Sequence, residues 1–363
     1  MNKKRVLILY TSIGSGHRIA GEAILDELLL QGFDAKTEDI LAYSEMKISA
    51  VTEKMAIRNK TLGSIYDFLW KQEFAKDIAN KSTGIFKENF QQLKQLIVNY
   101  KPDAIVCTQA LAGLLASEFL PNKPIYGVVT DFKVTPVWLA SKLSHYFVPN
   151  LPSKTYLLEK GVDAKSVSIT GIPVRKGFES NKNSKRYRKK KHLNIFILVG
   201  GLNQMKYFEH TTNLINQIKE ISKDYLTTVV CGSNDILKNK LNEFSSRNLK
   251  VFGKTDDPAI LMKEADIIIT KPGGLICAES LALGKPLLLI GKGYGQEKGN
   301  VDYTTNNGAA ISVEKISEIA QAIRIIQVYD ILKTMVRNAI RLGRPKATKI
   351  IVKFIMKGLS DTQ

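Results

Sequence analysis

Two segments in the first half of the sequence contain residues suited to proton transfer. The loop TSIGSGHR (residues 11–18) places two glycines just before His17, where a helix is expected to begin. Glycines let the backbone approach a ligand, and a helix N-terminus favours negative charge. An imidazole there can accept a proton near neutral pH, so we predict that His17 is a general base; a surface histidine without a role is the alternative. The residues of this loop expected near a substrate that accepts a transferred group, or near a phosphate, are Gly14, Ser15, Gly16 and Arg18.

The second segment is Thr130-Asp131-Phe132, at the end of a predicted strand. A carboxylate at Asp131 can orient an imidazolium or act as the base itself, and capping of the next turn is the alternative. A dinucleotide site is a rival interpretation of this half, because Glu38 and Asp39 end the second strand, where a ribose-binding acid would lie. However, the first loop lacks the third glycine of GxGxxG, which disfavours that interpretation.

Two loops and a polar cluster in the second half are suited to binding a nucleotide-sugar. The loop GGLNQ (residues 200–204) follows an apolar strand, and TKPGGL (residues 270–275) precedes a helix. Glycines at a helix mouth let free backbone N–H groups meet a diphosphate, and the spacing requires no metal. Glu279 lies about one turn into that helix, where a carboxylate can accept hydrogen bonds from a ribose diol. The candidate donor-binding residues in these segments and in the polar cluster GQEKGN (residues 295–300) are Gly201, Asn203, Lys271, Gly273, Gly274, Leu275, Glu279, Gln296, Glu297 and Asn300.

These loops must be positioned by alternating strands and helices. Short β-branched runs alternate with helical patterns along the chain, which predicts parallel βαβ units. The series restarts after residue 193, so we predict an α/β protein with two doubly wound parallel sheets. In such sheets ligands bind beyond the carboxyl ends of the strands, where all four loops lie. The predicted parts are an N-terminal domain at 1–180, a basic linker at 181–193, a second domain at 194–335 and a basic C-terminal helix at 336–363.

The charge and composition narrow the classes of function. The 363 residues carry 53 Lys and Arg against 34 Asp and Glu, a net charge of +19. Such an excess indicates an anionic partner, either nucleic acid or a membrane surface, unless it reflects only a lysine-rich proteome. The three scattered cysteines and four scattered histidines predict free thiols and no metal site. We expect neither a signal peptide nor a transmembrane helix, and a protein on the cytoplasmic side of the membrane.

Two segments are candidates for contact with lipid. Residues 333–357 hold eight Lys or Arg and no acid, and Lys349, Lys353 and Lys357 line one helix face. Such a helix either binds an anionic surface or packs its apolar side on the domain. Residues 46–74 mix aromatic, aliphatic and basic residues, so this segment is either a lipid-facing helix or a core helix.

The ordered motifs together resemble the diacylglycerol glycosyltransferase family, which includes monogalactosyldiacylglycerol synthases and processive diacylglycerol glucosyltransferases. More distantly, the chain is similar to the N-acetylglucosaminyltransferase that forms lipid II. The resemblance covers residues 5–315 and rests on the motifs GSGHRIAGEAI (14–24), TDF (130–132), TGIPVRKGF (170–178), VVCGSN (229–234), VFGKTDD (251–257), ITKPGGLICAESLALGKP (269–286) and GQEKGN (295–300).

This resemblance implies a GT-B fold, with two Rossmann-like domains facing a cleft and a last helix that returns to the first domain. It implies metal-independent, inverting transfer of a hexose from a UDP-sugar to diacylglycerol or a glycosyl-diacylglycerol at an anionic membrane surface, without cofactor or nucleic acid. His17 would be the base, with Asp131 as its partner or rival. By the same resemblance, Glu279 would hold the ribose, residues 273–275 the diphosphate, the 295–300 cluster the sugar, and Phe252 and Gly253 the uracil, with Gly232 also at the donor site.

Alternatives remain at this point. Transfer of N-acetylglucosamine to a polyprenyl-diphosphate lipid is the rival within the class, an NAD-linked oxidoreductase is a rival enzyme, and a nucleic-acid binding protein is suggested by charge alone. The choice between glucose and galactose depends on one or two hydroxyl contacts, which the sequence does not identify.

Overall fold

The chain folds into two compact units. The computed structural model describes residues 3–12, 14–44, 89–179, 192–199, 208–255, 257–293, 295–328 and 331–360. Unit 1 comprises Met1–Arg175, Tyr294–Gln296 and Lys346–Gln363, and unit 2 comprises Lys176–Gly293 and Glu297–Pro345. The end of the chain therefore belongs to the unit that contains its beginning.

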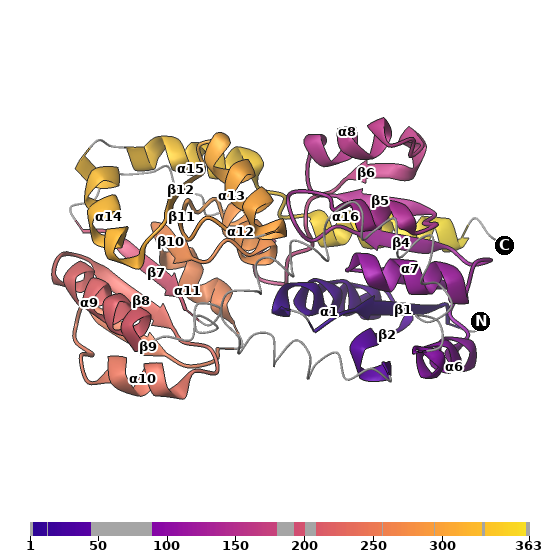
Figure 1. Ribbon diagram of the computed structural model, residues 1–363, viewed down its shortest axis with the longest axis horizontal. Helices are drawn as coiled ribbons and strands as arrows, with labels where there is room; N and C mark the ends of the chain where they lie inside the picture. The colour runs from indigo at the N-terminus through magenta and orange to yellow at the C-terminus, as the bar shows by residue number, and fades with distance from the viewer. Residues whose placement is uncertain are drawn as a thin grey trace. The chain divides into compact units, whose positions relative to one another are not determined.

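Unit 1 is built on a six-stranded parallel sheet (Figure 1). Its strands lie in the order β2-β1-β3-β4-β5-β6, so the chain reverses direction across the sheet between β1 and β3. The elements of unit 1 are β1 (Arg5–Tyr10), α1 (Ser15–Leu30), β2 (Asp34–Asp39), η1 (Ile40–Tyr43), α6 (Gln91–Tyr100), β3 (Ala104–Cys107), α7 (Ala110–Phe119), β4 (Ile125–Val128), η2 (Pro136–Ala140), β5 (His145–Val148), α8 (Leu151–Glu159), η3 (Ala164–Ser166), β6 (Val167–Ile169) and α16 (Ala347–Ser360).

Helices cover both faces of this sheet, because its strands are apolar on both sides. In β1, Val6 and Ile8 face α1 and α16, while Leu7 and Leu9 face α6 and α7. Alternate residues of a strand point to opposite faces, so a continuous apolar run predicts a strand buried on both. The run VLIL in the sequence is thus enough to place β1 in the middle of the layers.

The last helix, α16, completes the core of unit 1. Ile351, Val352, Ile355 and Leu359 are buried against the face of the sheet that α1 also covers. Figure 1 shows this helix, in yellow, among the indigo and magenta elements of unit 1. The apolar side of the basic C-terminal segment is therefore packed in the core, and its lysines at 349, 353 and 357 are exposed.

Unit 2 repeats the doubly wound pattern with the strand order β12-β11-β10-β7-β8-β9, again all parallel. Its reversal lies between β7 and β10. The elements are β7 (Asn194–Leu198), α9 (Phe208–Asp224), β8 (Leu226–Val230), α10 (Asp235–Asn242), β9 (Leu249–Phe252), α11 (Pro258–Glu264), β10 (Ile267–Thr270), α12 (Gly274–Ala282), β11 (Leu287–Ile290), α13 (Gln296–Asn306), β12 (Ala310–Val313), η5 (Ile316–Glu318), α14 (Ile319–Val328) and α15 (Ile331–Leu342).

The basic C-terminal segment is divided between the two units rather than forming one helix from residue 336. Helix α15 packs on α12 and α14 of unit 2, and the division between units falls at residues 345 and 346. Gly343 ends α15 so close to α12 that a Cβ there would lie 2.2 Å from the Leu281 carbonyl oxygen. This close approach joins α15 to a helix far away in the sequence. A sequence pattern does not show such a contact, and the pattern alone placed the start of the C-terminal helix at 336.

The predicted alternation of strands and helices in two doubly wound halves is confirmed. The lipid-facing candidate at 46–74 and most of the predicted linker at 181–193 lie outside the described residues. The three cysteines are buried free thiols, as predicted. Among the described residues, no helix has the length and apolar character needed to span a bilayer.

The packing of α16 can be tested with two substitutions of one residue type on one helix. Ile355→Ala removes a fully buried side chain and should lower the free energy of unfolding of unit 1 by about 2–4 kcal/mol. Ile350→Ala, at a side chain 48% exposed, should cost less than about 1 kcal/mol. Trp138 is buried in unit 1 and the sequence has no tryptophan in unit 2, so denaturation followed by tryptophan fluorescence reports on unit 1. Equal losses for the two variants would contradict the observed orientation of α16.

Candidate active site

The candidate base His17 lies in the first turn of α1, in the loop that follows β1. Gly14 caps the helix with a φ of +81°, a left-handed conformation that favours glycine. The ring of His17 is half-buried, and its Nδ1 lies 2.7 Å from Thr130 Oγ1 and 3.0 Å from the Thr108 carbonyl oxygen. The Thr108 hydroxyl donates in turn to the His17 carbonyl at 2.9 Å. The imidazole is therefore held by two neighbouring strand ends.

These residues meet at the point where the strand order reverses. His17 follows β1, Thr108 follows β3, and Thr130 and Asp131 follow β4, which are three adjacent strands of the sheet. Parallel strands end at the same edge, so residues separated by about ninety to more than a hundred positions come together there. The structure thus brings together the two residues predicted to carry the chemistry of this half, His17 and Asp131.

The surroundings of His17 favour its neutral form. Burial lowers the pKa of His17 from its usual value, while the negative charge of Asp131 and the hydrogen bond to the Thr108 carbonyl act in the opposite direction. Asp131 itself is buried, with 9% of its surface exposed. A ring with a lowered pKa is uncharged at pH 7 and retains a lone pair, which is the state that a general base requires.

The two acidic residues at the end of β2 make hydrogen bonds to their neighbours. Asp39 Oδ1 accepts hydrogen bonds from the backbone N–H groups of Ser12 at 3.2 Å and Leu41 at 3.1 Å, so it ties the loop after β1 to the end of β2. Glu38 accepts from the Tyr43 hydroxyl at 2.7 Å and pairs with Lys36. Their carboxylates are already engaged, which weakens the dinucleotide interpretation.

Thr11 supplies a further polar group at the carboxyl edge of the unit 1 sheet. The hydroxyl of Thr11, directly after β1, is completely buried and has no hydrogen-bond partner among the described residues. Buried hydroxyls are nearly always paired, so this one is suited to a polar group of a ligand. Of the loop residues predicted near the acceptor, Gly14 and Ser15 are exposed and Gly16 is half-buried, while Arg18 pairs with Glu22 one turn further along α1.

In unit 2, the glycine loop 271–273 opens α12 directly after β10, beside the reversal point of that sheet. Gly273 is the N-cap, and the first intrahelical bond runs from Cys277 N–H to the Gly273 carbonyl at 3.1 Å. Helix geometry therefore leaves the N–H groups of residues 274–276 without intrahelical partners. The N–H of Gly273 itself donates to the Lys271 carbonyl at 2.9 Å, so the candidate diphosphate donors shift by one residue along the helix.

Side chains from α13 tie this loop to the predicted sugar cluster. Lys271 Nζ lies 2.9 Å from Glu297 Oε1, with both side chains about one-third exposed. The Asn300 amide donates to the Pro272 carbonyl at 3.0 Å and is completely buried. In this structure Asn300 therefore supports the glycine loop, whereas the resemblance assigned it to the sugar. Gln296 begins α13, and Glu279 is buried in the second turn of α12.

The other predicted donor residues lie at the same edge or outside the described structure. Phe252 ends β9, its ring is 36% exposed, and its carbonyl accepts from Cys231 N–H at 2.8 Å. Gly253 follows it directly, and Gly232 follows β8 with a φ of +58°. Because the Phe252 carbonyl is already engaged, Gly253 is the better candidate for backbone contact with a base. Gly201 and Asn203 lie outside the described residues.

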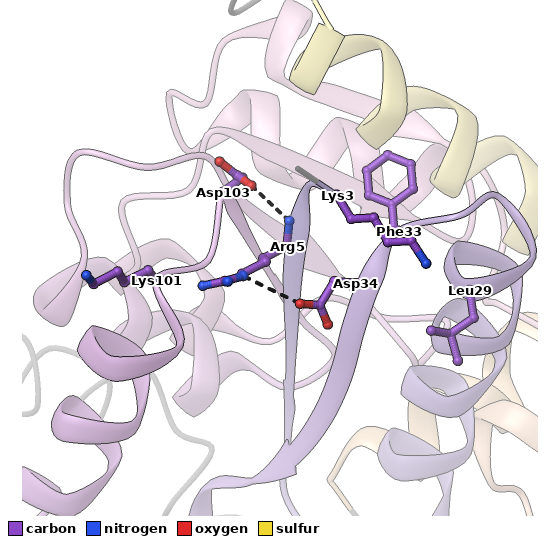
Figure 2. Close-up of a pocket in the computed structure, with 7 residues that line it drawn as sticks. All are labelled: Lys3, Arg5, Leu29, Phe33, Asp34, Lys101 and Asp103. Carbon is purple, nitrogen blue, oxygen red and sulfur yellow. Dashed lines mark hydrogen bonds and ion pairs between the residues drawn. The ribbon is translucent and has the colours of Figure 1, made fainter. Parts of the chain in front are cut away.

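A surface pocket of about 550 Å³ lies at the opposite edge of the unit 1 sheet (Figure 2). It is lined by Arg5, Asp34 and Asp103, which stand at or just before the amino ends of β1, β2 and β3. Arg5 uses its backbone N–H to bind Asp103 at 2.8 Å, and its guanidinium pairs with Asp34 at 3.4 Å. These groups tie the amino ends of the strands together. His17 follows the carboxyl end of β1, so the pocket is separate from the candidate active site.

Comparison with known proteins places both halves of the chain among glycosyltransferases. Residues 17–174 match the model of monogalactosyldiacylglycerol (MGDG) synthase, and residues 179–340 match that of glycosyl transferases group 1. The processive diacylglycerol beta-glucosyltransferases of Bacillus cytotoxicus and Bacillus subtilis are 28% and 27% identical. These alignments cover 97% and 98% of this chain, and 93% and 95% of the relatives.

The chain is therefore similar to diacylglycerol glycosyltransferases along nearly its whole length.

Solved structures agree with the fold implied for this family. MurG of Acinetobacter baumannii matches with a TM-score of 0.61 at 17% identity, covering 98% of this chain and 99% of MurG. The S. aureus MnaA–UDP complex matches with a TM-score of 0.63 at 16% identity, covering 99% and 97%. The glycosyltransferase SnogD of Streptomyces nogalater matches with a TM-score of 0.59 at 15% identity, covering 96% and 99%. The two parallel six-stranded sheets are those of a GT-B fold, as predicted.

Sequence reasoning missed the groups that hold the candidate site in place. Thr108 and Thr130 contact His17, and Asp39 ties down Ser12, but no motif joins these positions. The one feature of the sequence that points to these residues is their location, since each stands at the carboxyl end of a predicted strand. That location predicts proximity but not which atoms meet.

The effect of Asp131 on His17 gives a testable prediction. Asp131→Asn removes a negative charge that stabilises the imidazolium, so the pKa of His17 should fall further. An NMR titration of the His17 ring measures this change. Glu22→Gln is the matched control, because Glu22 lies on the same helix but pairs with Arg18, and it should leave the pKa of His17 unchanged. An unchanged or raised pKa in Asp131→Asn would remove Asp131 as the electrostatic partner.

Proposed function

We propose that the protein transfers a hexose from a UDP-hexose to the hydroxyl of diacylglycerol or of a glycosyl-diacylglycerol, with inversion and without a metal. The observation that carries this proposal is the hydrogen-bonded imidazole of His17 at the reversal point of the unit 1 sheet, where burial lowers its pKa. The sheet of unit 2 has a complementary feature at its own reversal point, a glycine-capped helix N-terminus. A base and an anion-binding helix are the two components that such a transfer requires.

On the acceptor side, His17 has the role of general base. The lipid hydroxyl loses its proton to the ring of His17 while its oxygen attacks the anomeric carbon from the face opposite UDP. The ring then becomes an imidazolium, which the charge of Asp131 stabilises. The buried hydroxyl of Thr11 is suited to a polar group of the acceptor.

On the donor side, the N-terminus of α12 has the role of receiving the diphosphate. The N–H groups of residues 274–276 and the positive end of the helix dipole favour a negative group there. Lys271 adds a cation, and its pairing with Glu297 joins the diphosphate loop to the predicted sugar cluster. Amide donors and a lysine can neutralise a leaving UDP, which supports transfer without a metal.

The relatives support this proposal over its rival. Those named above are processive diacylglycerol beta-glucosyltransferases, and the first half of the chain matches MGDG synthase. The structural likeness to MurG is compatible with transfer of N-acetylglucosamine to a polyprenyl-diphosphate lipid, but at 17% identity it bears on the fold alone.

We further propose that the protein works at an anionic membrane surface. The outer face of α16 presents exposed lysines at 349, 353 and 357, together with Ile350, which is 48% exposed. Each Lys or Arg near an anionic leaflet contributes about 1 kcal/mol, and exposed apolar side chains can enter the interface. The net charge of +19 adds to this attraction.

The test is an assay with diacylglycerol in vesicles and labelled UDP-glucose, UDP-galactose or UDP-N-acetylglucosamine, plus a polyprenyl-diphosphate acceptor in a parallel series. We expect labelled glycosyl-diacylglycerol from UDP-glucose or UDP-galactose, unchanged by EDTA, and faster with anionic than with neutral carrier lipid. Transfer confined to UDP-N-acetylglucosamine and the polyprenyl lipid would establish the rival. No transfer from any donor would refute both.

In the same assay His17→Ala should reduce turnover by about 10²–10⁴-fold, because the acceptor hydroxyl loses its base. His192→Ala is the matched control, since this exposed histidine lies in unit 2 and its contact is with the Asp224 carbonyl. Near-normal turnover in a folded His17→Ala variant would exclude His17 as the base.

Gly273→Ala tests the diphosphate loop. The backbone of Gly273 has an ordinary φ of −71°, and a Cβ there would meet Ile276 Cγ2 at 3.6 Å, an ordinary contact. The protein alone therefore tolerates alanine, but a ligand against this backbone would not. We expect an unchanged melting temperature and an affinity for UDP reduced about tenfold or more by calorimetry, which corresponds to about 1.4 kcal/mol. Ser280→Ala, which removes a hydroxyl bonded within α12, should bind UDP normally. Equal UDP affinities would place the diphosphate elsewhere.

A further inference from the structure

Among the residues that the structure describes, the ring of His17 is held through its Nδ1 nitrogen. Its Nδ1 lies 2.7 Å from the Thr130 hydroxyl oxygen and 3.0 Å from the Thr108 carbonyl oxygen, and the Thr130 hydroxyl lies 3.3 Å from that same carbonyl. Thr108 is fully buried and Thr130 is 5% exposed, so water does not compete freely for these contacts. Three groups from the ends of β1, β3 and β4 thus form one closed set of hydrogen bonds.

The chemistry of these groups determines where each proton lies. A carbonyl oxygen only accepts, so the Thr108 carbonyl requires Nδ1 of His17 to carry a proton and donate. The Thr130 hydroxyl donates a hydrogen bond to the same carbonyl. The lone pairs of the hydroxyl oxygen then face Nδ1–H of His17. The opposite tautomer would point a lone pair of Nδ1 at a carbonyl oxygen 3.0 Å away, which is repulsive. The free lone pair of the neutral ring therefore lies on Nε2.

We propose that Thr130 is a positioning residue for the transfer reaction: together with the Thr108 carbonyl, its hydroxyl selects the Nδ1–H tautomer of His17 and fixes the ring so that Nε2 receives the proton of the acceptor. This inference rests on the proposed role of His17 as the base. Thr130 acts through His17 and is not assigned a contact with either substrate.

The same contacts serve the ring after proton transfer. As the acceptor oxygen bonds to the anomeric carbon, its O–H bond breaks and an Nε2–H bond forms, while the electrons of the bond from sugar to phosphate leave with UDP. The imidazolium then donates from both nitrogens, and its Nδ1–H keeps the two oxygen acceptors that it already had. Hydrogen bonds to a charged group are stronger than those to a neutral one, so the set stabilises the product of proton transfer without rearrangement. Asp131 supplies the opposing charge.

The inference is tested with Thr130→Val, which removes the hydroxyl at nearly constant shape, and with Thr130→Ser, which keeps it. In Thr130→Val we expect kcat to fall about tenfold or more, with little change in the KM for the UDP-hexose or in UDP affinity. Thr130→Ser should remain within about threefold of the wild type. The inference would be overturned if kcat fell to the same extent in both variants, or if it fell in neither.

NMR of protein labelled with ¹⁵N-histidine provides a readout that does not depend on activity. The wild-type spectrum should show His17 protonated on Nδ1, and Thr130→Val should show a second tautomer or a lower pKa of His17, because one acceptor for the imidazolium is gone. Thr135→Val is the matched control: Thr135 is also buried, follows β4 and has no hydrogen-bond partner among the described residues, so the His17 signals should not move.

The two readouts separate the possible failures. If His17→Ala keeps its activity while Thr130→Val shifts the His17 signals, the proposed base is wrong but the hydrogen-bonded set exists. If His17→Ala is inactive while Thr130→Val has wild-type kcat and unchanged His17 signals, the function stands and the positioning role is refuted. Wild-type signals from an Nε2-protonated ring would also refute it.

Discussion

The reversal of strand order in each parallel sheet is the constraint on which both candidate sites depend. Where the order reverses, the connections from two adjacent strands leave to opposite faces, so the strand ends at that edge are not covered by a connecting helix. In unit 1 the reversal lies between β1 and β3, and the His17 ring is bound by a carbonyl directly after β3. In unit 2 it lies between β7 and β10, and the glycine loop follows β10 directly. Topology thus brings polar groups together at the edge where each ligand is proposed to bind.

The two units use this edge in different ways. The donor side relies on backbone N–H groups of residues 274–276, whose direction is determined by the helix and not by side chains. The acceptor side relies on one side chain, whose tautomer is determined by a carbonyl and a hydroxyl from other strands. A backbone site tolerates sequence change provided that its glycines remain, whereas the imidazole requires specific partners. The two halves are therefore expected to differ in how they respond to substitution.

Most of the layered fold could be predicted from the sequence because it depends on local patterns. The apolar run from Val6 to Leu9 is buried on both faces, and the restart of the pattern after residue 193 marks the second sheet. Strand β6 could not be predicted, because its three residues are a strand through pairing with β5. The close approach of Gly343 to Leu281 in α12 joins positions far apart in the sequence, so no local pattern predicts that α15 belongs to unit 2.

The candidate site was predictable in position but not in its connections. The motifs place His17, Asp131 and Gly273 at strand ends, where the structure also has them. The motif could not show that the Asn300 amide is buried against the Pro272 carbonyl, because a polar residue in a polar cluster has the same pattern whether it faces a ligand or supports a loop.

The packing of the last helix links the fold to the membrane proposal. Helix α16 buries its apolar row (Ile351, Val352, Ile355 and Leu359) in the core of unit 1, although it follows the first 175 residues of that unit only after the whole of unit 2. A fragment ending at residue 175 would lack this row, which packs with Val6, Ile8 and Val106 beside α1. Because the apolar row is committed to the core, the helix has a fixed rotation, and this rotation holds its lysines outward. The basic face is consequently fixed in unit 1, and the proposed attraction to an anionic surface would need no folding of the helix on binding.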